Sequence, residues 1–371
     1  MIIRDITNTI EKISPLAYAE DFDNVGLLVG DYNTQVTGVL VTLDTLEKTI
    51  DEAIEKQCNL IVSFHPIIFS GLKKLNGSNY VERVVIKAIK NNIAIYAMHT
   101  ALDNSIKGVS AKMCEVIGLE NTKVLIPQKG NIKKLTTYVP HKDADAVRNA
   151  LFIAGAGKIG HYDHCSFNIS GDGTYRANEE ANPVIGQKGQ MHQEPETCIG
   201  VIFEKHLESK ILKALFSTHP YEEIAYEIVT LDNKHQNIGM GMVGELKEAI
   251  DPVACFDLLK EKFHLKTIRH SALSDKKIKK IAVLGGSGSF AISQAKQAKA
   301  DLFITADLKY HDFYKAENQI VLADIGHYES EQFTKNLLVD YLLKKITNFA
   351  PALPAGRIIL SENNTNPINY I

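Results

Sequence analysis

The sequence feature that most restricts the fold is an alternation of short apolar runs with segments of helical periodicity. The apolar runs are GVLVTLD, NLIVS and IAIYAM in the first part of the chain and IKKIAVLGG, DLFIT and IVLAD near its end. Strands that are apolar almost without interruption are typical of parallel or mixed sheets covered by helices. Functional groups in such sheets gather at the carboxyl ends of strands, so the polar residues that follow these runs are the first candidates for a site.

The middle of the chain has a different pattern. From about residue 135 to residue 231, the order strand, helix, strand, strand, helix, strand matches the ferredoxin-like plan. We therefore predict an α+β domain at 128–235, inserted into a discontinuous metal-binding α/β domain made of 1–127 and 236–371. The segment 171–193 is rich in Gly, Asn, Glu and Gln, which predicts a long loop that is mobile or closes over something.

Composition excludes several classes of protein. The 371 residues are 45% hydrophobic and 23% charged, which is enough for about two cores. The net charge is −3 and both signs are interspersed, so we expect no nucleic-acid partner. No apolar run reaches the ~20 residues that cross a bilayer. Five scattered cysteines without a CxxC pair are typical of a reducing compartment. We therefore expect a cytoplasmic protein whose metal ligands are His and carboxylate side chains.

Two polar positions follow neighbouring strands of the first half. His65 ends an apolar strand and precedes Pro66, which restricts the backbone before it to extended conformations. Asp103 lies in the turn HTALD after the next strand, together with His99. Each has an ordinary structural interpretation, His65 as a hydrogen-bonded residue and Asp103 as a cap of the turn or helix. Because both arise at one edge of the sheet, metal ligation is an equal alternative.

The segment ADIGHYESEQF carries a second pair of candidates. His327 and Glu331 are four residues apart at the start of a predicted helix, a spacing that places them on one face. A helix N-terminus disfavours a protonated imidazole, so we expect His327 to be neutral and able to bind metal. The alternative is a solvated surface pair. In DLKYHDF, Asp307 and His311 follow another strand, where they could orient a substrate or transfer protons, or simply form a polar turn.

Two further motifs have both functional and structural interpretations. The loop Gly285 to Ser289 follows a strand, where its N–H groups could contact phosphate, although it matches neither GxGxxG nor a Walker loop. A tight turn alone also explains it. In the middle segment, His161, His219, Glu222 and Glu223 could bind metal, but their strand context favours hydrogen-bonded structural roles.

Taken together, the motifs resemble a known family. SFHPIIFSG, HTALDN, GHYESEQF and DFDNVGLLVG are similar to the Nif-three-like family, whose members are named GTP cyclohydrolase 1 type 2 homologues. AGAGKIGHYDHCSF, GDGTY, ANPVIG and HPYEE resemble its long bacterial form. The resemblance covers essentially the whole chain and is far more specific for family than for activity. It implies a two-lobed α/β fold with an inserted PII-like domain, and a ring-like homohexamer whose sites face an internal cavity.

The resemblance also implies a metal site for two divalent ions, which would be zinc, iron or manganese. Its ligands in this chain would be His65, Asp103, His327 and Glu331. The family has two consecutive His before the Pro, whereas this chain has Phe64 at the first of these positions. One ligand is therefore missing, and we expect the second ion to be held less tightly. Phe22 replaces the family's usual Trp in the N-terminal motif.

Two classes of function follow from these observations. The first is a metal-dependent hydrolase that acts on a nucleotide such as GTP or on a phosphoester, with His311 as a proton donor. The second is a non-catalytic metal-binding regulatory or scaffold protein whose PII-like insert senses a small molecule. The second is favoured by the missing ligand at Phe64 and by the lack of an unmistakable nucleophile.

Overall fold

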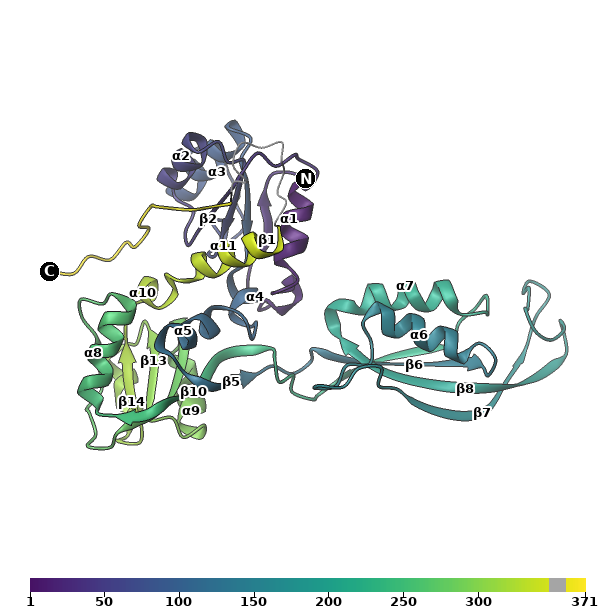
Figure 1. Cartoon of the computed structure of the whole chain (residues 1–371). Helices are drawn as coiled ribbons and strands as arrows, with labels where there is room; N and C mark the ends of the chain where they lie inside the picture. Colours follow the sequence, from purple (N-terminus) through teal and green to yellow (C-terminus); the bar gives the residue numbers. More distant parts are fainter. Residues whose placement is uncertain (347–357) are drawn as a thin grey trace. The chain divides into compact units, whose positions relative to one another are not determined.

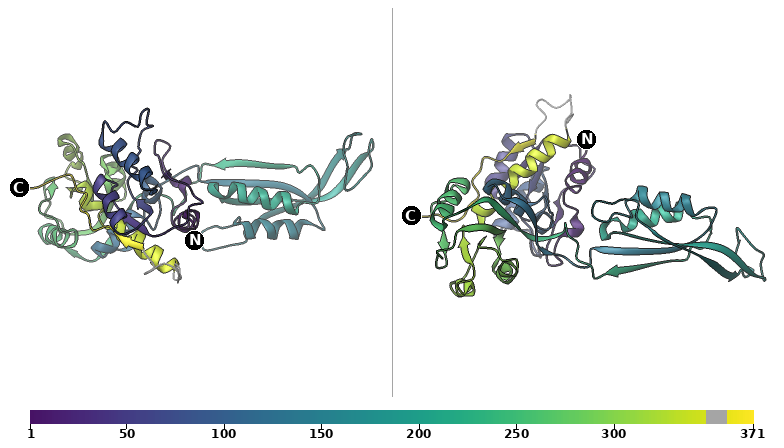
Figure 2. Two further views of the ribbon diagram at one scale, coloured as in Figure 1. Left: turned by 90° about the horizontal axis from the view of Figure 1, so that it is seen from above. Right: turned by 60° about the horizontal axis from the view of Figure 1, so that its bottom comes forward.

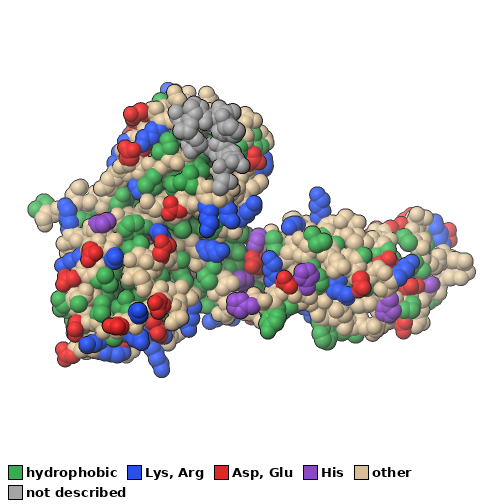
Figure 3. Space-filling model, viewed as in Figure 1, with side chains coloured by type: hydrophobic (Ala, Val, Ile, Leu, Met, Phe, Trp, Pro, Cys, Tyr) green, Lys and Arg blue, Asp and Glu red, His purple; other side chains and the backbone are tan. Residues whose placement is uncertain are grey.

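The computed structural model describes residues 1–346 and 358–371 (Figure 1). The chain divides into two compact units, one made of Met1–Pro127 with Gln236–Ile371 and the other of Gln128–His235. Both units combine helices with β-sheets, which confirms the predicted α/β class. None of the described helices is long and apolar enough to cross a membrane. Acidic and basic side chains are interspersed over the face seen in Figure 3.

The larger unit contains two sheets, and the first is a five-stranded sheet in the order β1-β4-β3-β2-β15. The four strands β15, β2, β3 and β4 are parallel, and β1 is antiparallel to β4. The strands are β1 (Gly26–Val29), β2 (Val39–Thr42), β3 (Leu60–Ser63), β4 (Ala94–Ala97) and β15 (Ile358–Leu360). Strands β2 to β4 are buried at every position, as their uninterrupted apolar sequences predict.

Helices cover both faces of this first sheet because its residues alternate in direction. Val39 and Val41 pack with α1 and α11, whereas Leu40 packs on the opposite face with α2 and α3. The helices of this layer are α1 (Ile3–Ile10), α2 (Glu47–Glu55), α3 (Tyr80–Lys90) and α11 (Thr334–Lys345). The short helices η1 (Leu16–Tyr18) and α4 (His99–Asp103) complete this part of the unit.

The second sheet has six strands in the order β11-β14-β13-β12-β10-β5. Strands β12, β13 and β14 are parallel, and the other pairings are antiparallel. The strands are β5 (Glu120–Pro127), β10 (Gly239–Ile250), β11 (Arg269–His270), β12 (Ile278–Ser287), β13 (Leu302–Ala306) and β14 (Val321–Asp324).

Helices also cover both faces of the second sheet. One face packs against α5 and α8, and the other packs against α9 and η4. These elements, with the remaining short helices of the unit, are α5 (Val109–Ile117), α8 (Pro252–Phe263), η3 (Ser289–Ala291), α9 (Ile292–Gln297), η4 (Tyr310–Ala316) and α10 (His327–Glu331). The carboxyl end of β14 leads directly into α10, which carries two of the predicted ligands.

The smaller unit, called the insert below, is a four-stranded antiparallel sheet in the order β7-β8-β6-β9. Its helices α6 and α7 lie side by side on one face of the sheet, and β7 and β8 extend past them as a long ribbon (Figure 2). The element order agrees with the ferredoxin-like plan. The elements are β6 (Ile132–Pro140), α6 (Ala144–Ala154), β7 (Phe167–Arg176), β8 (Met191–Glu204), η2 (Lys205–Leu207), α7 (Glu208–Thr218) and β9 (Tyr226–Leu231).

Removing the insert should leave a folded protein. Each buried apolar cluster consists of residues from one unit alone. Excision of the insert therefore removes its own core and leaves the clusters of the larger unit intact. The two connections leave from paired strands, where Pro127 lies opposite Gly239, so a short linker can close the gap. We expect a chain with residues 129–233 replaced by a Gly-Ser linker to be soluble, to bind metal and to unfold cooperatively, as measured by size-exclusion chromatography and circular dichroism. An aggregated product would contradict this division of the chain.

Candidate metal centre

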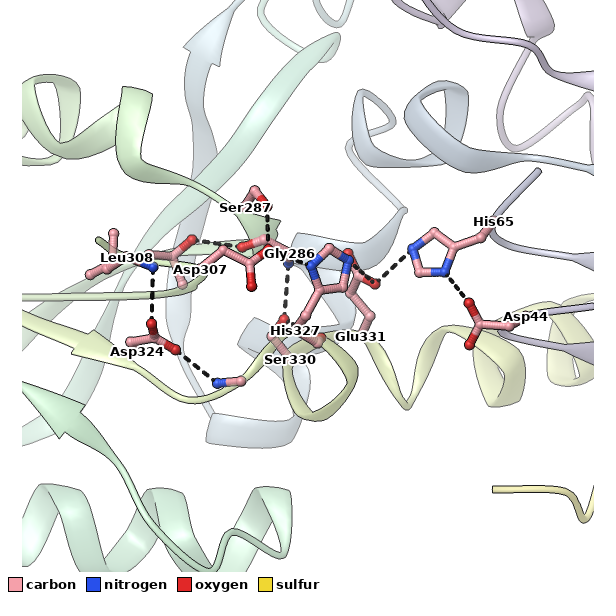
Figure 4. Close-up of polar contacts among 12 residues, drawn as sticks. Asp44, His65, Gly286, Ser287, Asp307, Leu308, Asp324, His327, Ser330 and Glu331 are labelled. Atoms are coloured by element: carbon pink, nitrogen blue, oxygen red, sulfur yellow. Dashed lines mark hydrogen bonds and ion pairs between the residues drawn. The ribbon is translucent and has the colours of Figure 1, made fainter. Parts of the chain in front are cut away.

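Three side chains converge where the two sheets of the larger unit meet. His65 follows β3 of the first sheet, whereas His327 and Glu331 occupy the two ends of α10, after β14 of the second (Figure 4). Nε2 of His65 lies 3.1 Å from Oε2 of Glu331, and Nε2 of His327 lies 3.3 Å from the same oxygen. One ligand atom from each residue lies within 4.8 Å of the others, so this cluster can hold a metal ion.

Each imidazole is held in place by a second carboxylate. Nδ1 of His65 lies 2.7 Å from Oδ1 of Asp44, and Nδ1 of His327 lies 2.7 Å from Oδ2 of Asp307 (Figure 4). An Nδ1–H bond to a carboxylate orients the ring and directs Nε2 away from it, which is the usual arrangement of metal-binding histidines. In this protein both Nε2 atoms are thereby directed at Glu331.

The Glu331 carboxylate is the most constrained member of the cluster. Its side chain is 4% exposed, and Oε2 is buried without a hydrogen bond from any residue the structure describes. The two nearby imidazole nitrogens lie at ion-pair distances but lack hydrogen-bond geometry. A buried carboxylate needs compensating positive charge, which the two imidazoles supply when they are protonated and which a cation between the three atoms would supply when they are neutral. The donor set therefore fits a divalent metal ion.

The glycine-rich loop after β12 makes room for this carboxylate. A Cβ atom on Gly286 would lie 2.4 Å from Oε1 of Glu331, and the residue adopts a φ of +67°. Its N–H donates to Oγ of Ser330 at 2.9 Å, so this amide is not free to bind phosphate. Gly286 therefore has a packing role beside the cluster, and phosphate contact by the rest of the loop stays a prediction.

The charges of the cluster depend on one another. Burial opposes the charge of His65, but its bond to Asp44 and its contact with Glu331 raise its pKa to about 10. Burial likewise opposes charge on His327, yet Asp307 and Glu331 raise its pKa to about 11. Burial of Glu331 favours its neutral form, but the two imidazoles lower its pKa to about 2. The expectation of a neutral His327 is thus wrong for the metal-free protein, because adjacent carboxylates outweigh the helix N-terminus.

Asp103 is the last residue of α4, and the charges of Glu331, His65 and His327 affect its pKa. Burial raises its pKa well above the usual range and the Glu331 carboxylate raises it further, whereas His65 lowers it. It does not belong to the group of atoms within 4.8 Å. Its role as a ligand remains a prediction.

Phe64 and His99 lie beside the cluster. The Phe64 ring is fully buried, with its centroid 4.8 Å from that of His65 and 5.8 Å from that of His99. His99 has a φ of +29°, and its Nδ1 lies 2.7 Å from Oδ1 of Asp23. A ring without a lone pair therefore occupies the space next to two imidazoles, and His99 already has a carboxylate partner.

Sequence reasoning missed the partners Asp44 and Asp23. Asp44 ends the run GVLVTLD, so it bears the signal that identified His65, a polar residue directly after a buried strand. Asp23 was visible only as part of the motif DFDNVG. Both lie far along the chain from the imidazoles they hold, and only folding brings them into contact.

The remaining predicted residues lie apart from the cluster. His311 is exposed on η4, where its ring centroid lies 5.1 Å from Tyr310 and 6.1 Å from Tyr314. None of its contacts within the described residues reaches the cluster, so its catalytic role stays a prediction. In the insert, Nε2 of the buried His219 lies 2.9 Å from the carbonyl oxygen of Tyr138, which agrees with a structural role.

The fold and this site can be compared with known proteins. The family model Duf34/NIF3 (NGG1p interacting factor 3) matches residues 1–367. The chain belongs to this family. The resemblance seen in the sequence motifs is thereby confirmed.

Relatives within the Duf34/NIF3 family match over the full length. The "GTP cyclohydrolase 1 type 2 homolog" of Bacillus subtilis is 36% identical over 371 residues, covering 99% of this chain and 98% of the relative. The protein of the same name from Staphylococcus epidermidis is 32% identical and covers all of both chains. A crystal structure of a Bacillus cereus protein related to NIF3 superposes with a TM-score of 0.86 at 35% identity, covering 100% of this chain and 99% of the other.

Metal binding should strengthen as the pH rises, because protons and the metal ion compete for the same nitrogen atoms. With pKa values of about 10 and 11, both imidazoles hold an extra proton at pH 8 in the metal-free protein. At a pH below these pKa values each imidazole must lose a proton before it can bind the metal ion. Raising the pH toward 10 therefore favours the complex. We expect release of about two protons per ion at pH 8, measured by titration calorimetry in buffers of different ionisation enthalpy. Binding without proton release would show that the imidazoles are not the ligands.

Proposed function

We propose that this chain is a cytoplasmic, metal-dependent hydrolase that acts on a nucleotide or phosphoester. His65, His327 and Glu331 would hold a divalent ion (zinc, iron or manganese), with Asp103 completing the set. The observation that supports this most directly is the buried Oε2 of Glu331, which lacks a hydrogen bond from the described residues and lies near two oriented Nε2 atoms. A divalent ion held by such ligands lowers the pKa of water and polarises a carbonyl or phosphoryl oxygen.

The chain's own residues would supply positioning and proton transfer. Asp44 and Asp307 hold the two imidazoles in place from behind, so the ligand atoms need little rearrangement when the ion binds. Ser287 donates to Asp307 and Thr365 donates to Asp44, which fixes these carboxylates in turn. His311, exposed on η4, is the proposed proton donor to the leaving group.

The names of two relatives decide which substrate should be tested first. Both full-length relatives described above carry the name GTP cyclohydrolase 1 type 2 homolog. We therefore propose GTP as the first candidate, with hydrolytic opening of the imidazole portion of its guanine. Phosphoester hydrolysis would use the same ligands with different substrate contacts. In either case we propose a ring-like homohexamer as the active assembly.

A non-catalytic role is the second candidate. It is favoured by Phe64, whose fully buried ring takes the place of a ligand beside His65 and His99. A site with one fully liganded ion suits metal-dependent regulation or scaffolding as well as it suits hydrolysis. Turnover by the purified protein distinguishes the two candidates.

Purified, metal-loaded protein should hydrolyse GTP or a phosphoester such as bis-p-nitrophenyl phosphate. Glu331→Gln should lower metal affinity by more than about 100-fold, because it removes charge from a ligand. It should abolish turnover for the same reason. Metal content by elemental analysis and product formation by chromatography are the measurements.

Two controls make this experiment decisive. Glu115→Gln removes one negative charge from an exposed position on α5 and should retain both metal and turnover. His311→Asn should lower turnover while metal content stays unchanged. Turnover that persists in Glu331→Gln would point to a contaminating enzyme, and absence of turnover with every substrate would favour the non-catalytic role.

Phe64→His should increase the amount of tightly held metal. The new imidazole would lie next to His65 and His99, where the phenyl ring offers no lone pair. After equal dialysis we expect about one ion per chain in the natural protein and about two in the variant. Phe64→Leu is the matched control, since it disturbs the same buried position without adding a nitrogen. Two ions in the natural protein would mean that another residue completes the second position.

A further inference from the structure

The insert contains a cavity of about 310 Å³ that none of the preceding chemistry uses. It lies among β6, β7, β8 and the turn after α7. The segments GDGTY, ANPVIG and HPYEE, by which the insert resembles the long bacterial form, all contribute residues to its wall. The loop between β7 and β8 is tied across to the turn, because the N–H of Asn182 donates to Oε1 of Glu222 at 2.6 Å. Three segments that are separate in the sequence thus form the wall of one cavity, called the chamber below.

Glu196 places a carboxylate in the wall of this chamber. The residue is 8% exposed, and its Oε1 accepts a hydrogen bond from the Tyr221 hydroxyl at 2.7 Å. Its Oε2 has no hydrogen-bond partner within residues 1–346 and 358–371. A Cβ atom on Gly173 would lie 2.2 Å from Oε2, so the glycine on β7 leaves the space that the carboxylate needs. Because none of the described residues donates to Oε2, this oxygen can accept a hydrogen bond from a ligand in the cavity.

Aromatic rings form much of the remaining wall. Tyr138, Tyr175 and Tyr221 line the cavity, and the centroids of the last two rings lie 6.0 Å apart in an edge-to-face arrangement. The Tyr175 hydroxyl donates to the carbonyl of Ile185 at 2.7 Å, which holds this ring against the loop. Nδ1 of His219 accepts from the N–H of Tyr221 at 3.1 Å. Hydrogen bonds therefore hold Tyr175 and Tyr221 in place in the cavity wall.

The charge of the wall selects among ligand classes. Three carboxylates, those of Glu196, Glu222 and Glu223, line the cavity against a single cationic side chain, Arg176. This excess of negative charge disfavours ligands that carry phosphate or carboxylate groups. Among the described residues the cavity holds no group of three ligands spaced for a metal ion. Tyrosine faces and a buried carboxylate instead attract an organic cation, through cation–π contacts and a charge-assisted hydrogen bond.

We propose that the insert binds a small organic cation, an amine or amidinium group carried on a flat apolar body. The cationic N–H groups donate to Oε2 of Glu196, and the body packs against the tyrosine rings that line the cavity. Glu222 and Glu223 at the exposed rim attract the same charge. This site belongs to the insert alone and does not depend on the metal cluster.

Titration calorimetry on the full chain, with a chelator present, tests this proposal. The probes are benzamidine and phenethylamine, with benzamide and benzoate as the neutral and anionic counterparts of benzamidine. We expect at least one cation to bind, and both counterparts to bind at least about tenfold more weakly, since they lack the charged donor.

Variants locate the binding at Glu196. Glu196→Gln should weaken cation binding by about tenfold or more. Gly173→Ala keeps every charge but pushes the carboxylate from its place, and should weaken binding as well. Glu179→Gln, an exposed charge change in the same loop, should leave affinity unchanged. The proposal is overturned if neither cation binds at millimolar concentration, if benzoate binds as well as benzamidine, or if a folded Glu196→Gln or Gly173→Ala protein keeps full affinity.

Discussion

The contact of one buried carboxylate with two imidazoles is the interaction on which the larger unit's site depends. Glu331 comes from the helix after β14 in the second sheet, and His65 comes from the end of β3 in the first. Because an isolated buried charge is costly, the cluster is stable only when both sheets bring their cationic groups or a metal ion to this point. The glycine at position 286 serves the same contact, since any side chain there would displace the carboxylate.

The same contact explains how the site can exchange protons for metal. In the metal-free protein the raised pKa values of His65 and His327 keep both rings charged, and these charges balance Glu331 together with Asp44 and Asp307. A divalent ion held by the cluster would supply equivalent charge at the same place. The Asp44 and Asp307 carboxylates already orient both rings, so binding of an ion would need little rearrangement of the side chains.

The insert applies a similar principle with different chemistry. Glu196 is also a buried carboxylate with an oxygen that lacks a hydrogen-bond partner among the described residues, and Gly173 gives it room as Gly286 does for Glu331. Tyrosine rings line the same cavity as Glu196, whereas imidazoles lie beside Glu331. The type of ring therefore determines which ligand we propose for each site. Imidazole nitrogens coordinate metal ions, whereas the faces of phenol rings attract organic cations.

The sequence by itself determined the alternation of strands and helices, the order of the insert's elements, and the pair His327 and Glu331, because apolar runs and an i, i+4 spacing are local signals. It did not predict that β7 and β8 extend into the segment 171–193, where polar residues pair as a ribbon. It also marked His65 and Asp103 as residues at the end of a strand or turn. Only the tertiary structure decided that Oε2 of Glu331 lies close to His65, that Asp44 and Asp307 hold the rings, and that neighbouring carboxylates raise the pKa of His327. The reason is physical: burial and charge–charge distance depend on how two sheets pack, and no local period encodes that packing.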